Sequence, residues 1–241
     1  MRIAVISDIH GNMEALNEVF DDIEKYGVDT VICLGDMVGY GPEPEVVVQQ
    51  IISRDIPTIM GNHELAMIDP SYLQWFNPAA RQSILTIMPW MSEESMTFIS
   101  NLETSISMCS GRFVHGFPPD SIITYLFQID NKGLMDAFGE LEEKICFIGH
   151  THKMAIVSYD GKTVIKSPLK EGLVKLYEDK KYIINNGSVG QPRDGNNTAK
   201  YLIWDVAEHS VDIRFVPYHI ARVTNKIVEA GLPEAHADRL W

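Results

Sequence analysis

The sequence predicts an α/β protein of 241 residues in which two β-sheets pack against each other within a single domain, residues 1–241. Three observations support this prediction. In the first half, short apolar runs alternate with segments of helical periodicity, and this β-α-β-α-β order is typical of a parallel sheet covered by helices. The second half is richer in short strand-like runs and contains the hairpin signal Asp160-Gly161, which predicts a second, mostly antiparallel sheet. No linker, repeat or low-complexity tract divides the chain.

The first half shows a regular order of strands and helices. The expected strands are residues 3–6, 31–34 and 57–60, and the expected helices are residues 13–26 and 43–53. Apolar residues recur every three or four positions from Met13 to Ile23, with Asn12 before them as a cap, which predicts the first helix. Pro42 and Pro44 mark the entry of the second.

From residue 70 to residue 107 the pattern changes to segments rich in Trp, Met, Phe and Ser, which predict a small helical insertion with helices at 78–88 and 92–101. Two interpretations remain open: the insertion caps the edge of a site, or it is a packing layer. Strands are then expected at 112–114, 145–148, 155–159, 163–166, 173–177, 182–185, 199–205 and 211–217. A helix over 219–230 ends before Gly231, a C-cap residue.

The charge balance excludes several classes of protein. Lys and Arg number 20 against 33 Asp and Glu, so the net charge is −13. Such a surface repels phosphate backbones and argues against a general nucleic-acid or anionic-membrane binder, but it allows a small anionic substrate held by local cations. No apolar stretch is long enough for a membrane span or a signal segment, so we expect a cytoplasmic protein. Cys33 and Cys146 lie in apolar runs and are expected to be buried hydrophobes.

Histidines recur beside Gly, Asp or Asn directly after apolar runs: His10, His63, His115, His150 and His152. Strand ends followed by glycine-rich turns are where α/β sheets build their sites. One such histidine alone is more often structural or solvated, whereas five in the same context favour a functional site.

Two pairs of these residues have metal-ligand spacing. Asp8 and His10 are two positions apart, which in extended chain directs a carboxylate and an imidazole to one side, and this combination suits a divalent transition metal. Taken alone, Asp8 could equally be a helix-start acid and His10 a turn residue. His150 and His152 repeat the spacing.

The remaining polar groups suggest a second metal. Asp36 follows an expected strand within a loop that contains three glycines, and an unpaired buried carboxylate there would carry a large desolvation cost. Its two oxygens allow it to bridge two cations. Asn62 offers a neutral carbonyl oxygen beside His63. The pattern therefore predicts a two-metal site.

In this order, the blocks resemble the signature of the calcineurin-like metallophosphoesterase superfamily, in its bacterial and archaeal phosphodiesterase-like branch. The blocks are Asp8-x-His10, Gly35-Asp36, Gly61-Asn62-His63-Glu64, His115 and Gly149-His150-x-His152. The resemblance runs from residue 1 to about residue 194. It implies an α/β fold that is a four-layer αββα sandwich with two central mixed β-sheets.

The resemblance also implies a role for each position. One metal would be held by Asp8, His10 and His152, the other by Asn62, His115 and His150, with Asp36 shared between them. A hydroxide bridging the metals would be the nucleophile. His63 would not be a ligand; it would lie near the scissile phosphate and stabilise developing charge or protonate the leaving oxygen. Oxygen and imidazole ligands without thiolate favour two divalent transition metal ions, with Mn expected first and Fe, Ni, Co or Zn as alternatives.

A second segment, residues 185–194, looks like a glycine-rich stretch common in bacterial and archaeal members, with Asn186 in place of a proline. Its amides are expected to pack beneath the metal loops. Arg193 is a candidate for binding a substrate phosphate oxygen, and the alternative is an internal salt bridge to Asp194 or Asp36. Tyr40 is a second candidate for substrate contact.

The sequence thus predicts a dinuclear metal-dependent phosphoesterase that hydrolyses a small phosphodiester. Two alternatives remain: a nucleotide-polyphosphate or Ser/Thr phosphoprotein phosphatase, and a non-catalytic metal-binding scaffold. The oligomeric state is left open.

Overall fold

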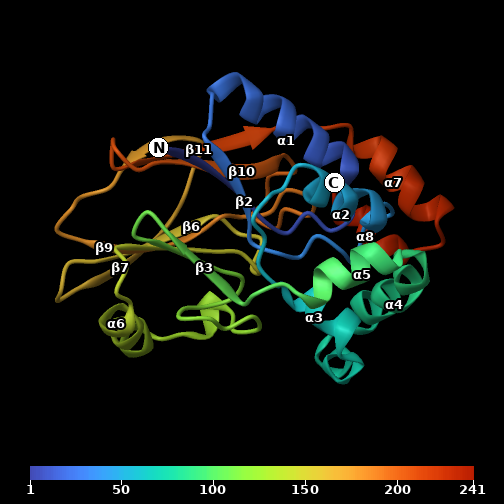
Figure 1. Cartoon of the computed structure of the whole chain (residues 1–241), viewed down its shortest axis with the longest axis horizontal. Helices are drawn as coiled ribbons and strands as arrows, with labels where there is room; N and C mark the ends of the chain where they lie inside the picture. Colours follow the sequence, from blue (N-terminus) through green and yellow to red (C-terminus); the bar gives the residue numbers. More distant parts are fainter.

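The computed structural model describes residues 1–241 and places two β-sheets face to face between outer layers of helices (Figure 1). The first sheet has the strand order β2-β1-β10-β11-β8, made of Thr30–Cys33, Arg2–Ile6, Ala199–Asp205, Ser210–Val216 and Gly172–Lys175. The second has the order β3-β4-β5-β9-β6-β7, made of Ser105–Met108, Gly111–Val114, Ile145–Ile148, Lys181–Asn185, Ala155–Tyr159 and Val164–Pro168. The predicted four-layer αββα sandwich is confirmed.

Both sheets are mixed. In the first, β1 and β2 are parallel, while β10 pairs antiparallel with β1 in a register that sets Ile3 opposite Trp204. In the second, β4, β5 and β9 are parallel neighbours. We expected the first half of the chain to form a parallel sheet and the second half a mostly antiparallel one. That assignment is wrong, because β10 from the second half pairs with β1 in the first sheet, and the strands β4, β5 and β9 are parallel to one another.

Helices cover the outer face of each sheet. The helices α1 (Met13–Tyr26), α2 (Pro44–Ser53) and α7 (Ile220–Glu229) pack on the first sheet, and α6 (Asn131–Glu140) packs on the second (Figure 1). None of the helices combines the length and the apolar character that crossing a membrane would require.

The four layers follow from the alternation of side chains along each strand. In β1, Ile3 and Val5 point into the core between the sheets, whereas Ala4 and Ile6 point toward the helices. In β9, Ile184 points between the sheets and Ile183 toward α6. Strands β1 and β9 are therefore buried on both faces, as their continuous apolar runs predict.

Some local expectations differ from the structure. Residues 57–60 form no strand and contribute only single bridges, Cys33 to Thr58 and Ile59 to Glu103. Strand β3 begins within the expected helical insertion, residues 70–107, and ends one residue beyond it. It is a strand because Ile106 and Met108 alternate onto the core between the sheets. Helix α6 was not predicted, although its capping residue Asp130 precedes a helical apolar spacing.

The helical segment consists of α3 (Asn62–Ile68), α4 (Pro78–Ile87) and α5 (Glu93–Ser100) with short 3-10 turns at Pro70–Trp75 and Met88–Trp90. Ile84 and Ile99 join the core on the first sheet, so α4 and α5 are a packing layer. Trp75 and Phe76 instead line a cavity at the strand ends, so the 3-10 turn caps the site. Each of the two interpretations holds for one part of the segment. The extent of a single domain over residues 1–241 stays a prediction.

Candidate metal centre

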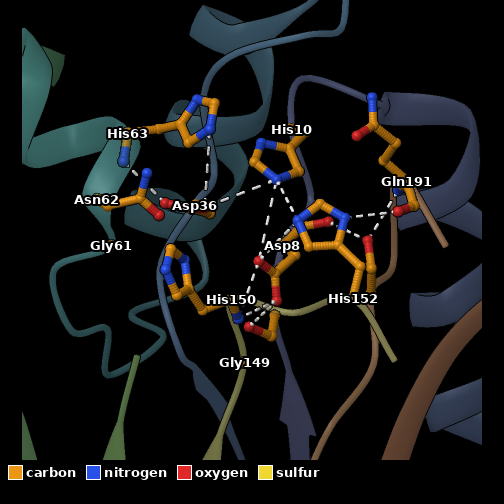
Figure 2. A network of polar contacts seen from close by, with 12 residues as sticks. Asp8, His10, Asp36, Gly61, Asn62, His63, Gly149, His150, His152 and Gln191 are labelled. Carbon is orange, nitrogen blue, oxygen red and sulfur yellow. Dashed lines mark hydrogen bonds and ion pairs between the residues drawn. The ribbon is translucent and has the colours of Figure 1, made fainter. Parts of the chain in front are cut away.

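The predicted metal-binding residues meet at the carboxyl ends of four strands, a parallel pair from each sheet. Figure 2 shows how all of them except His115 lie. Asp8 and His10 follow β1, Asp36 follows β2, His115 follows β4, and His150 and His152 follow β5. Asn62 and His63 begin α3. All of these except Asn62, which is partly exposed, are buried. Two sheets that face each other thus bring residues from distant parts of the sequence to one edge.

The loops reach this centre through sharp left-handed turns. Asp8, His10, Asp36, His150 and His152 all have positive φ angles between 51° and 67°. A non-glycine residue in this region costs roughly 1–2 kcal/mol, and such strain concentrates at functional sites. The expectation that Asp8 and His10 converge is confirmed, but the extended chain expected to bring them together is replaced by these turns.

The donor atoms form two groups that share one carboxylate. The first contains Asp8, His10, Asp36 and His152, and the second contains Asp36, His115 and His150; within each group the donor atoms lie within 4.8 Å of one another. In the first group His152 Nε2 is 3.2 Å from Asp8 Oδ1, and in the second His115 Nε2 is 3.3 Å from Asp36 Oδ2. Asp36 alone belongs to both groups.

Asn62 adjoins the second group. Its Oδ1 lies 3.1 Å from His115 Nε2, although Asn62 comes from the start of α3 and His115 from the end of β4. The seven predicted ligands are therefore all brought together.

Backbone carbonyls orient three of the imidazoles. The Nδ1 atoms of His10, His115 and His152 donate to the carbonyls of Val38, Leu34 and Gln191 at 2.8, 2.7 and 2.6 Å. Because a carbonyl only accepts, Nδ1 carries the proton and Nε2 presents a lone pair to the centre.

The fourth imidazole is turned the other way. His150 Nε2 contacts the carbonyl of Ile123 at 3.2 Å, which leaves Nδ1 as its donor atom. All four imidazoles thus have one nitrogen anchored and one available.

The donor set fits divalent cations. His10 Nε2 and His152 Nε2 are 3.1 Å apart, and with both protons on Nδ1 two lone pairs face each other. Around His115, the facing atoms are carboxylate and amide oxygens, which are also acceptors. A cation relieves the repulsion between converging acceptors. Around His115 a proton does so in the metal-free protein, because the Asp36 carboxylate outweighs burial and raises the pKa of this imidazole, and a metal ion would take the place of that proton. Mixed imidazole and oxygen ligands suit a transition metal.

The charges of the site depend on one another. Burial opposes ionisation of Asp36, but His115 and His63 hold the pKa of its carboxyl well below the usual value. Burial likewise opposes the cationic form of His115, yet the Asp36 carboxylate outweighs it and raises the pKa of His115 to about 9. Burial, followed by the neighbouring His63, lowers the pKa of His10. The carboxylates remain ionised, as metal ligands must.

His63 lies beside the donor groups but belongs to neither. Its Nε2 is 4.0 Å from Asp36 Oδ2, and its Nδ1 is buried without a hydrogen-bond partner. The ring contacts Tyr40 and Phe76 at centroid distances of 4.6 and 4.8 Å. Burial lowers the pKa of His63 to about 4.

Arg193 and Tyr40 adjoin each other on the wall of a cavity of about 290 Å³ that opens onto the centre. The Arg193 guanidinium carbon lies 5.6 Å from the centroid of the Tyr40 ring. Arg193 forms no ion pair; Asp194 pairs instead with Lys200 Nζ at 2.9 Å. The alternative of a salt bridge from Arg193 to Asp194 or Asp36 is therefore wrong, because Lys200 occupies Asp194 and the histidines surround Asp36.

The glycine-rich segment packs beneath the metal loops as predicted. The amides of Val189 and Gly190 donate to the carbonyls of Ser7 and Asp8 at 2.9 and 3.0 Å. Ser188 Oγ donates to the same Asp8 carbonyl at 2.8 Å. These bonds hold the left-handed turn that aims the Asp8 side chain.

Sequence reasoning assigned no structural role to Glu64 and missed Arg239. Glu64 is fully buried and accepts four backbone N–H groups; its place three residues after Gly61 is a capping-box signal that could have revealed it. Arg239 lines the cavity from the C-terminal segment, and nothing in its local sequence indicates that position.

The fold and the buried His/Asp cluster together define a metallophosphoesterase. The family model described as "Calcineurin-like phosphoesterase superfamily domain" matches residues 1–209, and the chain belongs to this family of metal-dependent phosphoester hydrolases.

Three similar proteins match the chain over nearly its whole length, two of them at more than 30% identity. An uncharacterized protein from Methanocaldococcus jannaschii is 38% identical over 99% of this chain and 97% of that protein. The crystal structure of a metallophosphoesterase from Sphaerobacter thermophilus is 33% identical, covers 100% of this chain and 98% of that one, and superposes with a TM-score of 0.86. A hypothetical protein from Pyrococcus horikoshii shares the fold at 17% identity, with a TM-score of 0.81 over 100% of this chain and 97% of that one.

Proposed function

We propose that this protein is a dinuclear metal-dependent phosphodiesterase acting on a small phosphate ester. The observation that carries the proposal is the membership of Asp36 in both donor groups. We assign Asp8, His10 and His152 to one metal ion, and Asn62, His115 and His150 to the other, with Asp36 bridging. The mixed oxygen and imidazole set supports Mn as the first choice, with Fe, Ni, Co and Zn as alternatives.

Two divalent ions in such a site supply charge neutralisation and a hydroxide nucleophile near neutral pH. The contribution of the chain is to position them. Because each imidazole is anchored through one nitrogen to a carbonyl, its other nitrogen cannot rotate away from the centre. The preformed geometry saves the cost of ordering these side chains when the ions bind.

His63 is the candidate for contact with the reacting phosphate. Its ring is fixed between Tyr40 and Phe76, and it lies on the cavity wall beside Asp36. With its pKa lowered to about 4, the imidazole is neutral near pH 7 and can donate a hydrogen bond to developing charge. It can give a proton to the leaving oxygen only when the negative charge of a bound phosphate raises that pKa, and Arg193 can bind a phosphate oxygen.

The size of the cavity favours a small substrate over a folded phosphoprotein. About 290 Å³ is at the lower end of the range for small-molecule sites. A nucleotide-polyphosphate remains an alternative substrate, and a non-catalytic scaffold remains the alternative of another class. A cytoplasmic location and the lack of general nucleic-acid binding stay predictions from the sequence.

Metal analysis and substrate comparison on one preparation test the proposal. The protein, loaded with Mn²⁺, is analysed for metal per chain and assayed with bis-p-nitrophenyl phosphate, p-nitrophenyl phosphate and a dinucleotide polyphosphate. We expect two metal equivalents and a higher kcat/KM on the diester than on the monoester. Two equivalents without hydrolysis of any substrate would establish the scaffold, and a single equivalent would contradict the dinuclear assignment.

A further inference from the structure

Two arginines line the cavity beside the metal centre without any carboxylate partner. Arg193 and Arg239 both border the cavity, and neither forms an ion pair. The Nε atom of Arg193 is buried without a hydrogen-bond partner. In a chain of net charge −13, two unpaired arginines at one site are unexpected, since acidic residues are abundant enough to neutralise them. Arg193 Nη2 donates to Gln191 Oε1 at 2.8 Å, and its remaining donors, with no carboxylate opposite them, are available to an anionic ligand.

Arg239 is fixed in place by its neighbours in the C-terminal segment. It follows the short helix α8 (Glu234–Asp238), and Ala237 and Leu240 on either side are buried. From the same helix, the ring of His236 packs on Tyr40 at a centroid distance of 4.8 Å. Arg239 itself remains exposed. The backbone of Arg239 is therefore held against the site while its side chain is free to contact a ligand. This segment lies beyond residue 209, where the family match ends.

The Tyr40 ring lies between the metal centre and Arg193. Its ring packs on His10 at 4.5 Å and on His63 at 4.6 Å, and the guanidinium of Arg193 lies 5.6 Å from the ring centroid. Burial raises the pKa of Tyr40, and the positive charge of Arg193 opposes that rise. The Tyr40 ring thus contacts both the predicted ligand His10 and Arg193, and Arg239 borders the same cavity.

Beyond Arg193 the surface continues as two further hollows that carry more cations. One, of about 580 Å³, is bordered by Lys153 and Lys166, and the other, of about 610 Å³, by Lys153 and Arg239. Arg193 borders both hollows as well as the cavity at the metal centre. An anion that begins at the metal centre and extends outward would meet positive charge along this path.

From this arrangement we propose that Arg239, together with Arg193, binds a second phosphate group of the substrate, so that preferred substrates carry at least one phosphate besides the one hydrolysed. The proposal rests on the proposed function, because the phosphate to be hydrolysed occupies the metal centre. A guanidinium presents a planar fork of donors that matches phosphate oxygens, which is why two arginines suit this role better than lysines.

A pair of non-hydrolysable anions tests this second phosphate site. Methylphosphonate carries one anionic group and methylenebisphosphonate carries two, and the carbon–phosphorus bonds of both resist hydrolysis. Binding of each to the Mn²⁺-loaded protein is measured by isothermal titration calorimetry. For the unaltered protein we expect methylenebisphosphonate to bind at least about tenfold more tightly, since charge-assisted hydrogen bonds are the strong ones.

Substitution of Arg239 decides whether that preference comes from the arginines. Arg239→Ala should lower the ratio of the two affinities about tenfold, and Arg239→Lys should lower it less, because the charge remains and the fork is lost. Arg222→Ala is the matched control, because this substitution removes the same charge. Arg222 is exposed on α7 and borders none of these hollows. It should leave the ratio unchanged. Melting temperatures confirm that each variant folds.

The outcomes separate this inference from the proposed function. If Arg239→Ala binds methylenebisphosphonate in preference to methylphosphonate as strongly as the unaltered protein does, the inference is overturned. This is the result expected if the bisphosphonate only chelates the metal ions. Hydrolysis of bis-p-nitrophenyl phosphate by that same protein would leave the proposed function intact. The opposite result is also distinguishable. If the unaltered protein hydrolyses no ester, but Arg239→Ala still lowers the ratio of the two affinities, the second phosphate site is supported and the proposed function is wrong.

Discussion

The side chain of Glu64 lies against the backbone of Asp36, and its Oε2 accepts the Asp36 amide at 2.7 Å. The same oxygen accepts the Gly61 amide at 3.0 Å, while Oε1 accepts the amides of Met37 and Val38 at 2.7 and 3.1 Å. One buried carboxylate therefore ties the loop after β2 to the first turn of α3. These two segments carry the shared carboxylate and the Asn62 and His63 side chains, so Glu64 is a positioning residue for the centre.

Glu64→Gln should weaken metal binding about 10- to 100-fold, the usual effect of removing a partner that orients ligands. The amide nitrogen of glutamine would face backbone N–H groups and cannot accept from them. Titration of Mn²⁺ into the metal-free protein measures the loss. Glu140→Gln, at an exposed position of α6, is the control. Equal affinities in the two variants would show that Glu64 does not position the centre.

Asp36→Asn should lower the occupancy of both metal sites. The change keeps the shape of the side chain and leaves Oδ1 able to accept the His63 amide, now at 2.9 Å, but it removes the charge that both donor groups share. Elemental analysis after gel filtration gives the metal per chain, with exposed Asp136→Asn as the control. Two full equivalents in Asp36→Asn would count against a bridging role.

His63→Asn should keep both metals and lose turnover by about 10²- to 10⁴-fold, the range for a positioned acid or hydrogen-bond donor. The reason is that His63 lies outside both donor groups but on the wall of the cavity. The measurement is kcat on bis-p-nitrophenyl phosphate together with metal content, and His209→Asn, with a side chain 54% exposed, is the control. Loss of a metal in His63→Asn would mean that His63 is a ligand.

Gly39→Ala should also reduce turnover, by tenfold or more, because displaced groups lose their productive geometry. A Cβ at Gly39 would lie 2.0 Å from His63 Nδ1, so the ring must move. Gly161→Ala provides a matched control: its φ of +90° is close to the +86° of Gly39, but no atom lies within 4 Å of its Cβ. Both variants bear the same backbone strain, and only the first should lose kcat. Similar kcat values would show that the ring position is unimportant.

Phe147→Ala should destabilise the protein by about 3–5 kcal/mol, as expected for a large cavity in a core. Phe147 is fully buried between the sheets, with Phe113 and Trp204 at centroid distances of 5.1 and 5.2 Å. Urea unfolding measures the change. Phe127, which is 73% exposed, serves as the control, and Phe127→Ala should cost less than about 1 kcal/mol. If Phe147→Ala lowered the free energy of unfolding as little as Phe127→Ala does, the core around Phe147 would have to relax and fill the cavity.

Much of the fold was predictable because its signals are local. The continuous apolar run from Ile3 to Ile6 is visible in the sequence, and it already indicates a strand with both faces covered. Strand β3 and residues 57–60 were misassigned because their state depends on partners: β3 exists through its pairing with β4, while Thr58 and Ile59 each find only a single bridge.

The candidate metal ligands also came from the sequence, since aspartate, asparagine and histidine after strand-like runs have few other roles in such number. What the tertiary structure decided is how they are held and what surrounds them. The anchoring of His10 by Val38, the four amides on Glu64 and the approach of Arg239 all join residues that are distant in the chain or unremarkable in local pattern. Local periodicity and residue type specify the strands and the donors, but contacts between distant segments depend on how two sheets pack, and this packing is a property of the whole chain.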